Sequence, residues 1–167
     1  MQLPSTKLYA QKEIMDAVND ISAICPEGEP FFDKLDDFLI NVASQKIYSA
    51  LFEMIGDKPL ILTGGFGKRI AKGIDSGEFP NIPYILFNGG IRKGNKPQVI
   101  KSNIDTLEDC AKYVMIDDTI YAGTTYRAIK EFLAENGFTV NKCIAMYDGC
   151  PVKKDDVESL FRYYDYF

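Results

Sequence analysis

Two adjacent carboxylates followed by a small, hydroxyl-bearing turn make up the segment of this sequence best suited to chemistry. The apolar run Tyr113–Ile116 leads directly into Asp117 and Asp118, and the pattern of residues 126–133 predicts an amphipathic helix. The start of such a helix presents unpaired N–H groups and the positive end of a dipole, which favour an anion such as phosphate. The two aspartates suit sugar hydroxyls or a hydrated divalent cation. Together these groups match a phosphorylated ribose, and the alternative is an ordinary turn that caps a helix.

The composition is that of a globular protein and excludes several kinds of active site. The chain has 167 residues, of which 46% are hydrophobic and 26% charged, enough for a sizeable core. A net charge of −5 argues against a general nucleic-acid or membrane-surface binder, and no apolar run approaches a membrane span or a signal peptide. The absence of histidine removes Ser–His and Cys–His pairs, histidine-ligated zinc and histidine general bases. The four cysteines lack C-x-x-C spacing, so reduced thiols in a cytoplasmic protein are expected.

Apolar segments alternate with helical patterns in the second part of the chain. Strands are expected at residues 59–63, 83–88, 113–117 and 140–147, with helical patterns after the first and third. This alternation predicts an α/β fold with a parallel sheet covered on both faces. Residues 1–58 are expected to form a first helix that ends near Ile24 and a longer second helix, capped by Asp33 and ended by Gly56. We interpret residues 1–58 as a helical hood on an α/β core of residues 59–167, in one domain.

Glycine-containing segments with cations follow the first two predicted strands. Residues 63–69 match neither a Walker A loop nor the G-x-G-x-x-G pattern, yet their glycine backbone with Lys68 and Arg69 could wrap a diphosphate. Residues 89–97 are expected to be mobile and attractive to a polyphosphate. Because ligands bind beyond the carboxyl ends of parallel strands, both segments are expected at the same edge as the two aspartates. A tight turn and a plain exposed basic loop are the respective alternatives.

The segment with the two acids resembles the phosphoribosyl-pyrophosphate (PRPP) motif of type I phosphoribosyltransferases. Its Ala122-Gly123-Thr124 variant is most similar to the orotate phosphoribosyltransferase branch. The resemblance implies a phosphoribosyltransferase-type, doubly wound core and transfer of ribose 5-phosphate from PRPP to a nitrogenous base, with release of pyrophosphate. It implies that the 5′-phosphate is bound by Tyr121, Ala122, Gly123, Thr124 and Thr125, and pyrophosphate by Thr63, Gly64, Gly65, Lys68 and Arg69.

The same resemblance supplies candidate catalytic residues. Arg92, Lys93 and Lys96 match an Arg-Lys-x-x-Lys run on the loop that closes over PRPP in orotate enzymes, although the loop here lacks a His-Gly element and looks shorter. Carboxylates would stabilise positive charge on the sugar, while Mg²⁺, Lys and Arg would stabilise the departing diphosphate. We therefore assign catalysis to Arg92, Lys93, Lys96, Asp117 and Asp118. Mg²⁺ is expected to bind the two aspartates through water.

The base is less well defined by the sequence. Orotate enzymes carry an Asp-Arg pair after the fourth strand and a lysine in the hood, whereas this chain has Asp148-Gly149 and no clear counterpart of that lysine. Orotate is therefore not the expected substrate. Tyr147 is a candidate to stack on a purine, pyrimidine or related base. The alternative is that the aromatic residues close a core or an interface.

Two other functions remain open at this stage. The chain could be a non-catalytic protein of the same fold that binds PRPP or a nucleotide as a sensor or regulator. It could also be an unrelated flavodoxin-like domain. The family resemblance implies a homodimer, whereas the net charge of −5 predicts no nucleic-acid or membrane partner.

Overall fold

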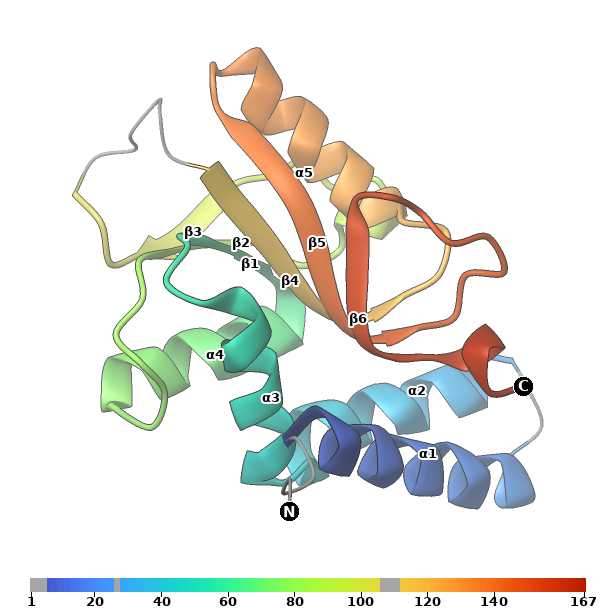
Figure 1. Ribbon diagram of the computed structural model, residues 1–167. Coiled ribbons are helices and arrows are strands. Elements are labelled where there is room, and N and C mark those ends of the chain that lie inside the picture. The colour runs from blue at the N-terminus through green and yellow to red at the C-terminus, as the bar shows by residue number, and fades with distance from the viewer. Residues whose placement is uncertain (1–5, 26–27, 106–111) are drawn as a thin grey trace.

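The protein is built on one six-stranded sheet with helices on both faces (Figure 1). The computed structural model describes residues 6–25, 28–105 and 112–167. The strand order is β3-β2-β1-β4-β5-β6, and every neighbouring pair is parallel except β2 and β3. The strands are β1 Leu60–Thr63, β2 Tyr84–Phe87, β3 Val99–Ser102, β4 Lys112–Ile120, β5 Thr139–Asp148 and β6 Val157–Arg162. The predicted α/β fold with a largely parallel sheet is confirmed.

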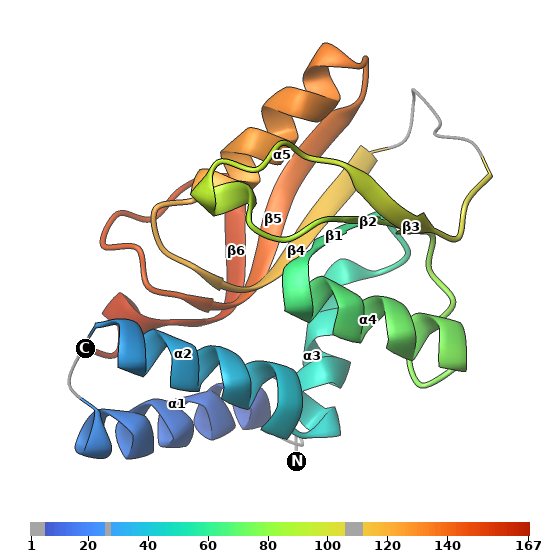
Figure 2. The same cartoon turned by 180° about the vertical axis from the view of Figure 1, so that it is seen from behind.

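The chain winds outward from the middle of the sheet in both directions. Helix α4 (Gly64–Ser76) connects β1 to β2, and helix α5 (Thr124–Glu135) connects β4 to β5 on the opposite face (Figures 1 and 2). Strands β1 and β4 are neighbours, so the strand order reverses between them. Their carboxyl ends therefore form the crevice at which open α/β sheets bind ligands.

Alternation of side chains along the strands separates two apolar layers. Leu62 and Ile116 pack with α4 and the N-terminal helices, whereas Ile61 and Met115 pack against α5. Ile61 is the register partner of Met115, so β1 and β4 reach the same edge at Thr63 and Asp117, two residues further on. Because side chains alternate along each strand, consecutive residues at this edge point to opposite faces of the sheet.

The N-terminal helices cover the face of the sheet opposite α5. They are α1 (Thr6–Ile24), α2 (Glu29–Asp37), the π-helical turn η1 (Phe38–Val42) and α3 (Gln45–Ile55). The prediction of one long second helix capped by Asp33 is wrong, because Asp33 lies inside α2 and a break at Ser44 precedes α3. The Tyr48 hydroxyl donates hydrogen bonds to two carbonyls at this break, those of Leu39 and Ile40. Gly56 ends α3 as predicted, with a φ of 69°.

Other differences from the predicted elements concern strands and helix starts. The edge strand β3 and the strand β6 were not predicted; all four residues of β3 are exposed, so they carry no buried-strand pattern. Strand β4 stays extended to Ile120 instead of turning after the acids, and α4 begins at Gly64 rather than near Lys68. Among the described residues, Cys25, Cys143 and Cys150 are free thiols, and Cys110 lies outside them. No helix in the described ranges is both long and apolar enough to cross a membrane.

Candidate active site

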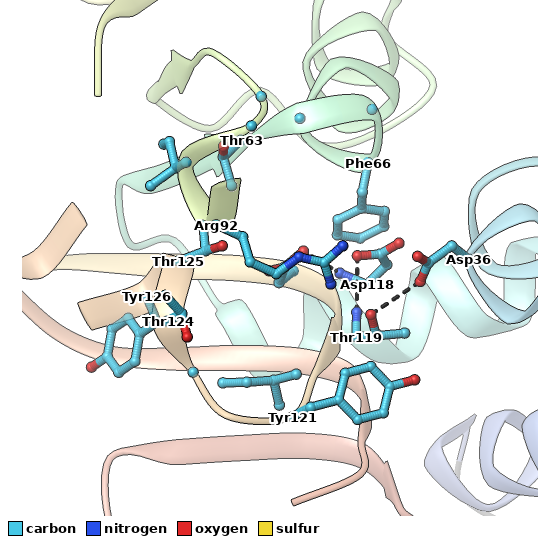
Figure 3. A pocket seen from close by; sticks show the side chains of 18 of the residues that line it. Asp36, Thr63, Phe66, Arg92, Asp118, Thr119, Tyr121, Thr124, Thr125 and Tyr126 are labelled. Atoms are coloured by element: carbon cyan, nitrogen blue, oxygen red, sulfur yellow. Dashed lines mark hydrogen bonds between the residues drawn. The ribbon is translucent and has the colours of Figure 1, made fainter. Parts of the chain in front are cut away.

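A cavity of about 630 Å³ opens at the crevice between the ends of β1 and β4. Four stretches of chain line it (Figure 3). These are part of α2 and η1, residues 63–66 at the start of α4, residues 89–93 after β2, and residues 117–126 from β4 into α5. The segments predicted to follow the first three strands therefore meet in one place.

Two helices begin at this cavity without a side-chain cap. Neither Thr63, the N-cap residue of α4, nor Gly123, that of α5, caps its helix through a side chain. The Thr63 hydroxyl instead donates to the carbonyl oxygen of Asn88 at 2.8 Å. Both helix starts thus keep N–H groups available at the cavity, and both dipoles have their positive ends there. Such a pair of helix N-termini favours anionic ligands.

The turn before α5 is fixed by two cations. The Ala122 carbonyl oxygen accepts hydrogen bonds from Arg127 Nη1 at 2.6 Å and from Lys154 Nζ at 2.8 Å. Gly123 has a φ of 77°, and a Cβ at this position would lie 2.9 Å from Lys154 Nζ. Only glycine meets both requirements without strain.

The basic segment after β2 is folded rather than open. The Gly90 carbonyl accepts from the backbone N–H groups of Lys93 and Asn95, and Ile91 is buried under the short 3₁₀ helix η2 (Ile91–Lys93). The Asn88 side chain bonds the Lys96 carbonyl at 3.1 Å and the Gln98 N–H at 2.8 Å. These contacts hold Arg92 and Lys93 at the cavity, while Lys96 lies outside its lining.

Three carboxylates gather at the other side of the cavity. Asp117 and Asp118 lie in the extended part of β4, and each accepts a hydrogen bond at 2.9 Å from the backbone N–H of the next residue. The third is Asp36 of α2, which accepts a hydrogen bond from the Thr119 hydroxyl at 3.0 Å (Figure 3). Thr119 therefore ties the N-terminal helices to β4 beside the acid pair.

Burial and mutual repulsion raise the pKa of all three carboxyl groups. Burial, reinforced by the charge of Asp118, raises the pKa of Asp36 to about 7, and burial raises the pKa of Asp117 to about 6. The pKa of Asp118 is raised well above its usual value by burial and then by the charge of Asp117. The Arg92 guanidinium lowers the pKa of Asp36 and Asp117 in part. The three carboxyl groups therefore resist ionisation on their own, and a bound cation would favour their ionised form.

The donor set fits Mg²⁺ in the manner usual for phosphate sites. Within the described ranges, no group of three or more Asp, Glu, Cys or His side chains converges to hold a metal by itself. Mg²⁺ does not need such a cage, since it keeps several waters and binds one or two carboxylates together with substrate phosphates. Asp117 and Asp118 both line the cavity next to the helix starts and offer that kind of ligand.

Four predicted site residues are not brought to the cavity. Arg69 makes two hydrogen bonds of 2.8 Å to Glu78, and its guanidinium lies over the rings of Tyr48 and Phe79. Lys68 lines a separate groove on the outer side of α4. Both point away because residues 64–76 form a helix whose first turn alone reaches the crevice. The other two are Lys96 and Tyr147.

Tyr147 is part of the core rather than of the cavity wall. It is 3% exposed, stacks on Phe161 with ring centroids 5.8 Å apart and contacts the Tyr121 ring at 5.9 Å. Its position matches the alternative in which the aromatic residues close a core. Its neighbour Tyr121 does line the cavity, as do Phe32, Phe66 and Tyr126.

The sequence interpretation missed a stripe of three residues on the N-terminal helices. Phe32, Asp36 and Ile40 follow one another at intervals of four, and all three line the cavity. They flank the buried stripe of Phe31, Leu35 and Leu39. The sequence does place Asp36 next to the apolar stripe of this helix. It does not show which part of the protein that side of the helix faces, so it could not assign Asp36 to the cavity.

Comparison with known proteins supports the same architecture. No family model and no curated protein matches the chain. Among solved structures, UMP synthase from Leishmania donovani is similar with a TM-score of 0.52 and 17% identity, over 78% of this chain and 30% of that chain. The orotate phosphoribosyltransferase of Francisella tularensis is similar with a TM-score of 0.50 and 14% identity, over 84% of this chain and 70% of that one.

The chain therefore spans less than a third of the UMP synthase chain that it matches. At these identities the likeness concerns the fold, which the strand order and the position of the cavity establish independently. The predicted resemblance is confirmed at that level: this chain has the fold of the type I phosphoribosyltransferases.

Proposed function

We propose that the protein is a Mg²⁺-dependent phosphoribosyltransferase that transfers ribose 5-phosphate from PRPP to a nitrogenous base and releases pyrophosphate. The observation that carries this proposal is the convergence on one cavity of two helix starts without side-chain caps and an acid pair, of which Asp118 is buried and Asp117 partly buried. PRPP combines the groups that such a cavity suits, namely a phosphate and a diphosphate with a polyol between them. The fold similarity to phosphoribosyltransferases supports the same assignment.

Each part of PRPP has a suitable partner in the cavity. The N–H groups of residues 121–125 are suited to the 5′-phosphate. Residues 63–65 at the start of α4, with Arg92 and Lys93, are suited to the diphosphate. The ribose would then lie beside Asp117 and Asp118, which can accept hydrogen bonds from its 2′- and 3′-hydroxyls. Lys68, Arg69 and Lys96 have no direct role in this arrangement, since none of them lines the cavity.

The reaction would draw on electrostatic positioning more than on proton transfer. As the bond from ribose C1 to pyrophosphate breaks, positive charge develops on the sugar and negative charge on the diphosphate. Asp117 and Asp118 would stabilise the sugar cation, and Arg92, Lys93 and the α4 N-terminus would stabilise the leaving group. When bound to the two aspartates, Mg²⁺ would supply further charge neutralisation to the diphosphate.

A second candidate function is a sensor of PRPP or of a nucleotide. The position of Lys96 favours it, because one cation of the predicted catalytic set does not reach the cavity. In a sensor the helix starts and the acid pair would bind the ligand as proposed, but no base would be turned over.

Both functions assume that residues 1–58 and 59–167 act as one domain. We propose this because one buried cluster includes Leu35 and Leu51 from the N-terminal helices together with Leu62 and Ile116 from the sheet. A fragment of residues 59–167 would expose that apolar surface and should fail to fold on its own.

The decisive experiment measures pyrophosphate release from PRPP with a panel of purine and pyrimidine bases, with Mg²⁺ and with excess chelator. Base-dependent release that needs Mg²⁺ is the expected result. Calorimetric binding of PRPP without turnover of any base would identify the sensor. Absence of PRPP binding would contradict both functions.

A further inference from the structure

The cavity has two ends of opposite chemistry. One part, here called the cationic end, is lined by Thr63, Gly64, Gly65, Arg92, Lys93 and residues 122–125. The other part, here called the acidic end, is lined by Phe32, Asp36, Ile40, Phe66, Asp118 and Tyr121. In Figure 3, Thr63, Thr124 and Thr125 lie on one side and Asp36, Phe66 and Tyr121 on the other, with Arg92 extending between them. If the phosphoryl groups occupy the cationic end, the base must occupy the acidic end.

Aromatic and aliphatic side chains from separate parts of the chain line the acidic end. The rings of Phe32 and Tyr121 are in contact, with centroids 4.4 Å apart and planes inclined at 54°. Ile40 and the buried ring of Phe66 complete the apolar lining. Such walls suit a flat heterocycle, because ring faces and aliphatic groups pack on it over a large area.

The polar group offered to that heterocycle is a carboxylate held in a fixed position. Asp36 is anchored by the Thr119 hydroxyl at 3.0 Å, and it lies close enough to Asp118 for each to affect the other's pKa. A carboxylate accepts hydrogen bonds and, when ionised, donates none. Asp36 and Asp118 both line this end of the cavity, so a carboxylate on the base would lie against two carboxyl groups.

From this geometry we infer that Asp36 determines which base is accepted, and that the base is neutral and donates N–H hydrogen bonds, as an amino-substituted purine or pyrimidine does. An anionic base would meet like charge at the acidic end and is rejected there. The inference rests on the proposed function, since it takes the phosphoryl groups to occupy the cationic end. It makes Asp36, on a helix of the N-terminal hood, a specificity-determining residue.

The test compares two nucleotides that share ribose and phosphate and differ only in the base. Binding of adenosine 5′-monophosphate, which carries an amino group, and of orotidine 5′-monophosphate, which carries a carboxylate, is measured by calorimetry for the wild-type protein. The wild type is expected to prefer the adenosine nucleotide. At about pH 8, where the Asp36 carboxyl is ionised, that preference should fall by roughly tenfold or more in Asp36→Asn, since a hydrogen bond to a charged acceptor is replaced by a weaker one.

Asp37→Asn is the matched control. Asp37 is the next residue of α2, is exposed, accepts a hydrogen bond from Asn41 and does not line the cavity. It undergoes the same loss of charge on the same helix. It should leave the preference for the adenosine nucleotide unchanged.

Several results would overturn the inference. These are a wild-type protein without preference, an Asp36→Asn variant that keeps the wild-type preference, or a variant that loses affinity equally for both nucleotides and for PRPP. The last outcome would place Asp36 in metal or phosphate binding. PRPP binding by the wild type is measured in the same series, so failure of the proposed function is distinguished from failure of this inference alone.

Discussion

The cationic and acidic ends of the cavity are built in different ways, although the segment of residues 117–126 contributes to both. The cationic end consists mainly of backbone groups at two helix starts, each encoded by a short continuous segment. The acidic end consists of side chains brought together from distant positions, of which Asp36 and Thr119 are 83 residues apart. Under the proposed function, recognition of phosphate would therefore follow from a local motif, whereas recognition of the base would depend on how the hood packs on the sheet.

The largest effect is expected from neutralising the acids where the two ends meet. Asp117→Asn and Asp118→Asn each remove a preorganised electrostatic group, and loss of such a group raises the barrier by about 2.7–4 kcal/mol, or about 10²–10³-fold in kcat. Asp118→Asn should also raise the melting temperature near pH 7, because it removes a buried carboxylate whose pKa is raised by burial and repulsion. Pyrophosphate release and thermal melts measure the two effects. Wild-type turnover in both variants would refute the assignment.

The next largest effect is expected at the turn before α5, and two glycine substitutions distinguish a local change at the cationic end from backbone strain in general. Gly123→Ala introduces a Cβ at a positive φ and 2.9 Å from Lys154 Nζ, so the Lys154 ammonium must move and its hydrogen bond to the Ala122 carbonyl is weakened. Gly137→Ala is the control, since Gly137 has a similar φ of 84° with nothing within 4 Å of the added Cβ. Both variants should be destabilised by about 1 kcal/mol.

Only Gly123→Ala is expected to weaken PRPP binding, by about tenfold, which corresponds to about 1.4 kcal/mol. Calorimetric titration of PRPP into both variants provides the measurement. Equal affinity in the two variants would show that the turn before α5 does not hold the phosphate.

A smaller effect is expected in the pH dependence of stability, to which the carboxyl groups near the acidic end contribute. The pKa of Asp36 is about 7 and that of Asp117 about 6 in the folded protein, against 3.8 for an ordinary aspartate. Between about pH 4 and 7 the folded protein thus binds more protons than the unfolded chain, and stability falls as the pH rises through this window. The pKa of Glu78 is lowered to about 2 by Arg69, so its opposite effect appears below about pH 4.5.

Thermal melts from pH 5 to pH 8 should therefore show a decreasing melting temperature, with a shallower decrease in Asp36→Asn than in Asp37→Asn. An identical slope in the two variants would mean that the acidic end does not control this dependence.

The smallest effect concerns a cation that the sequence assigned to pyrophosphate. Arg69→Met should leave PRPP affinity within about twofold of wild type, because Arg69 is bound to Glu78 and lies over two rings outside the cavity. Its free energy of unfolding should fall by about 1 kcal/mol or less, as is usual for a partly exposed ion pair. Arg92→Met, a matched change inside the cavity, should weaken PRPP binding clearly. A loss in Arg69→Met equal to that in Arg92→Met would reverse the assignment.

Features encoded by neighbouring residues could be predicted from the sequence, whereas features that depend on contacts between distant residues could not. The strands, the turn at Gly123 and the acid pair were predictable because buried strands and helix starts are governed by neighbouring residues. The edge strand β3 was not, since its exposed residues look like a loop until β2 is placed beside them. The place of Asp36 at the cavity was not predictable, because it depends on contact with Thr119, which is distant in the sequence. Arg69 was misplaced because the extent of α4 decides which way its side chain points.

The compact fold of residues 89–97 has a consequence for how the site exchanges with solution. The backbone that carries Arg92 and Lys93 is already folded, so little backbone freedom is lost when an anion arrives. In enzymes with a loop that must shut, its reopening often delays departure of products and shields reactive species from water. With a pre-folded segment, substrate would bind and product would leave quickly, but water would have access to the reacting groups. We therefore expect slow hydrolysis of PRPP to ribose 5-phosphate when no base is present.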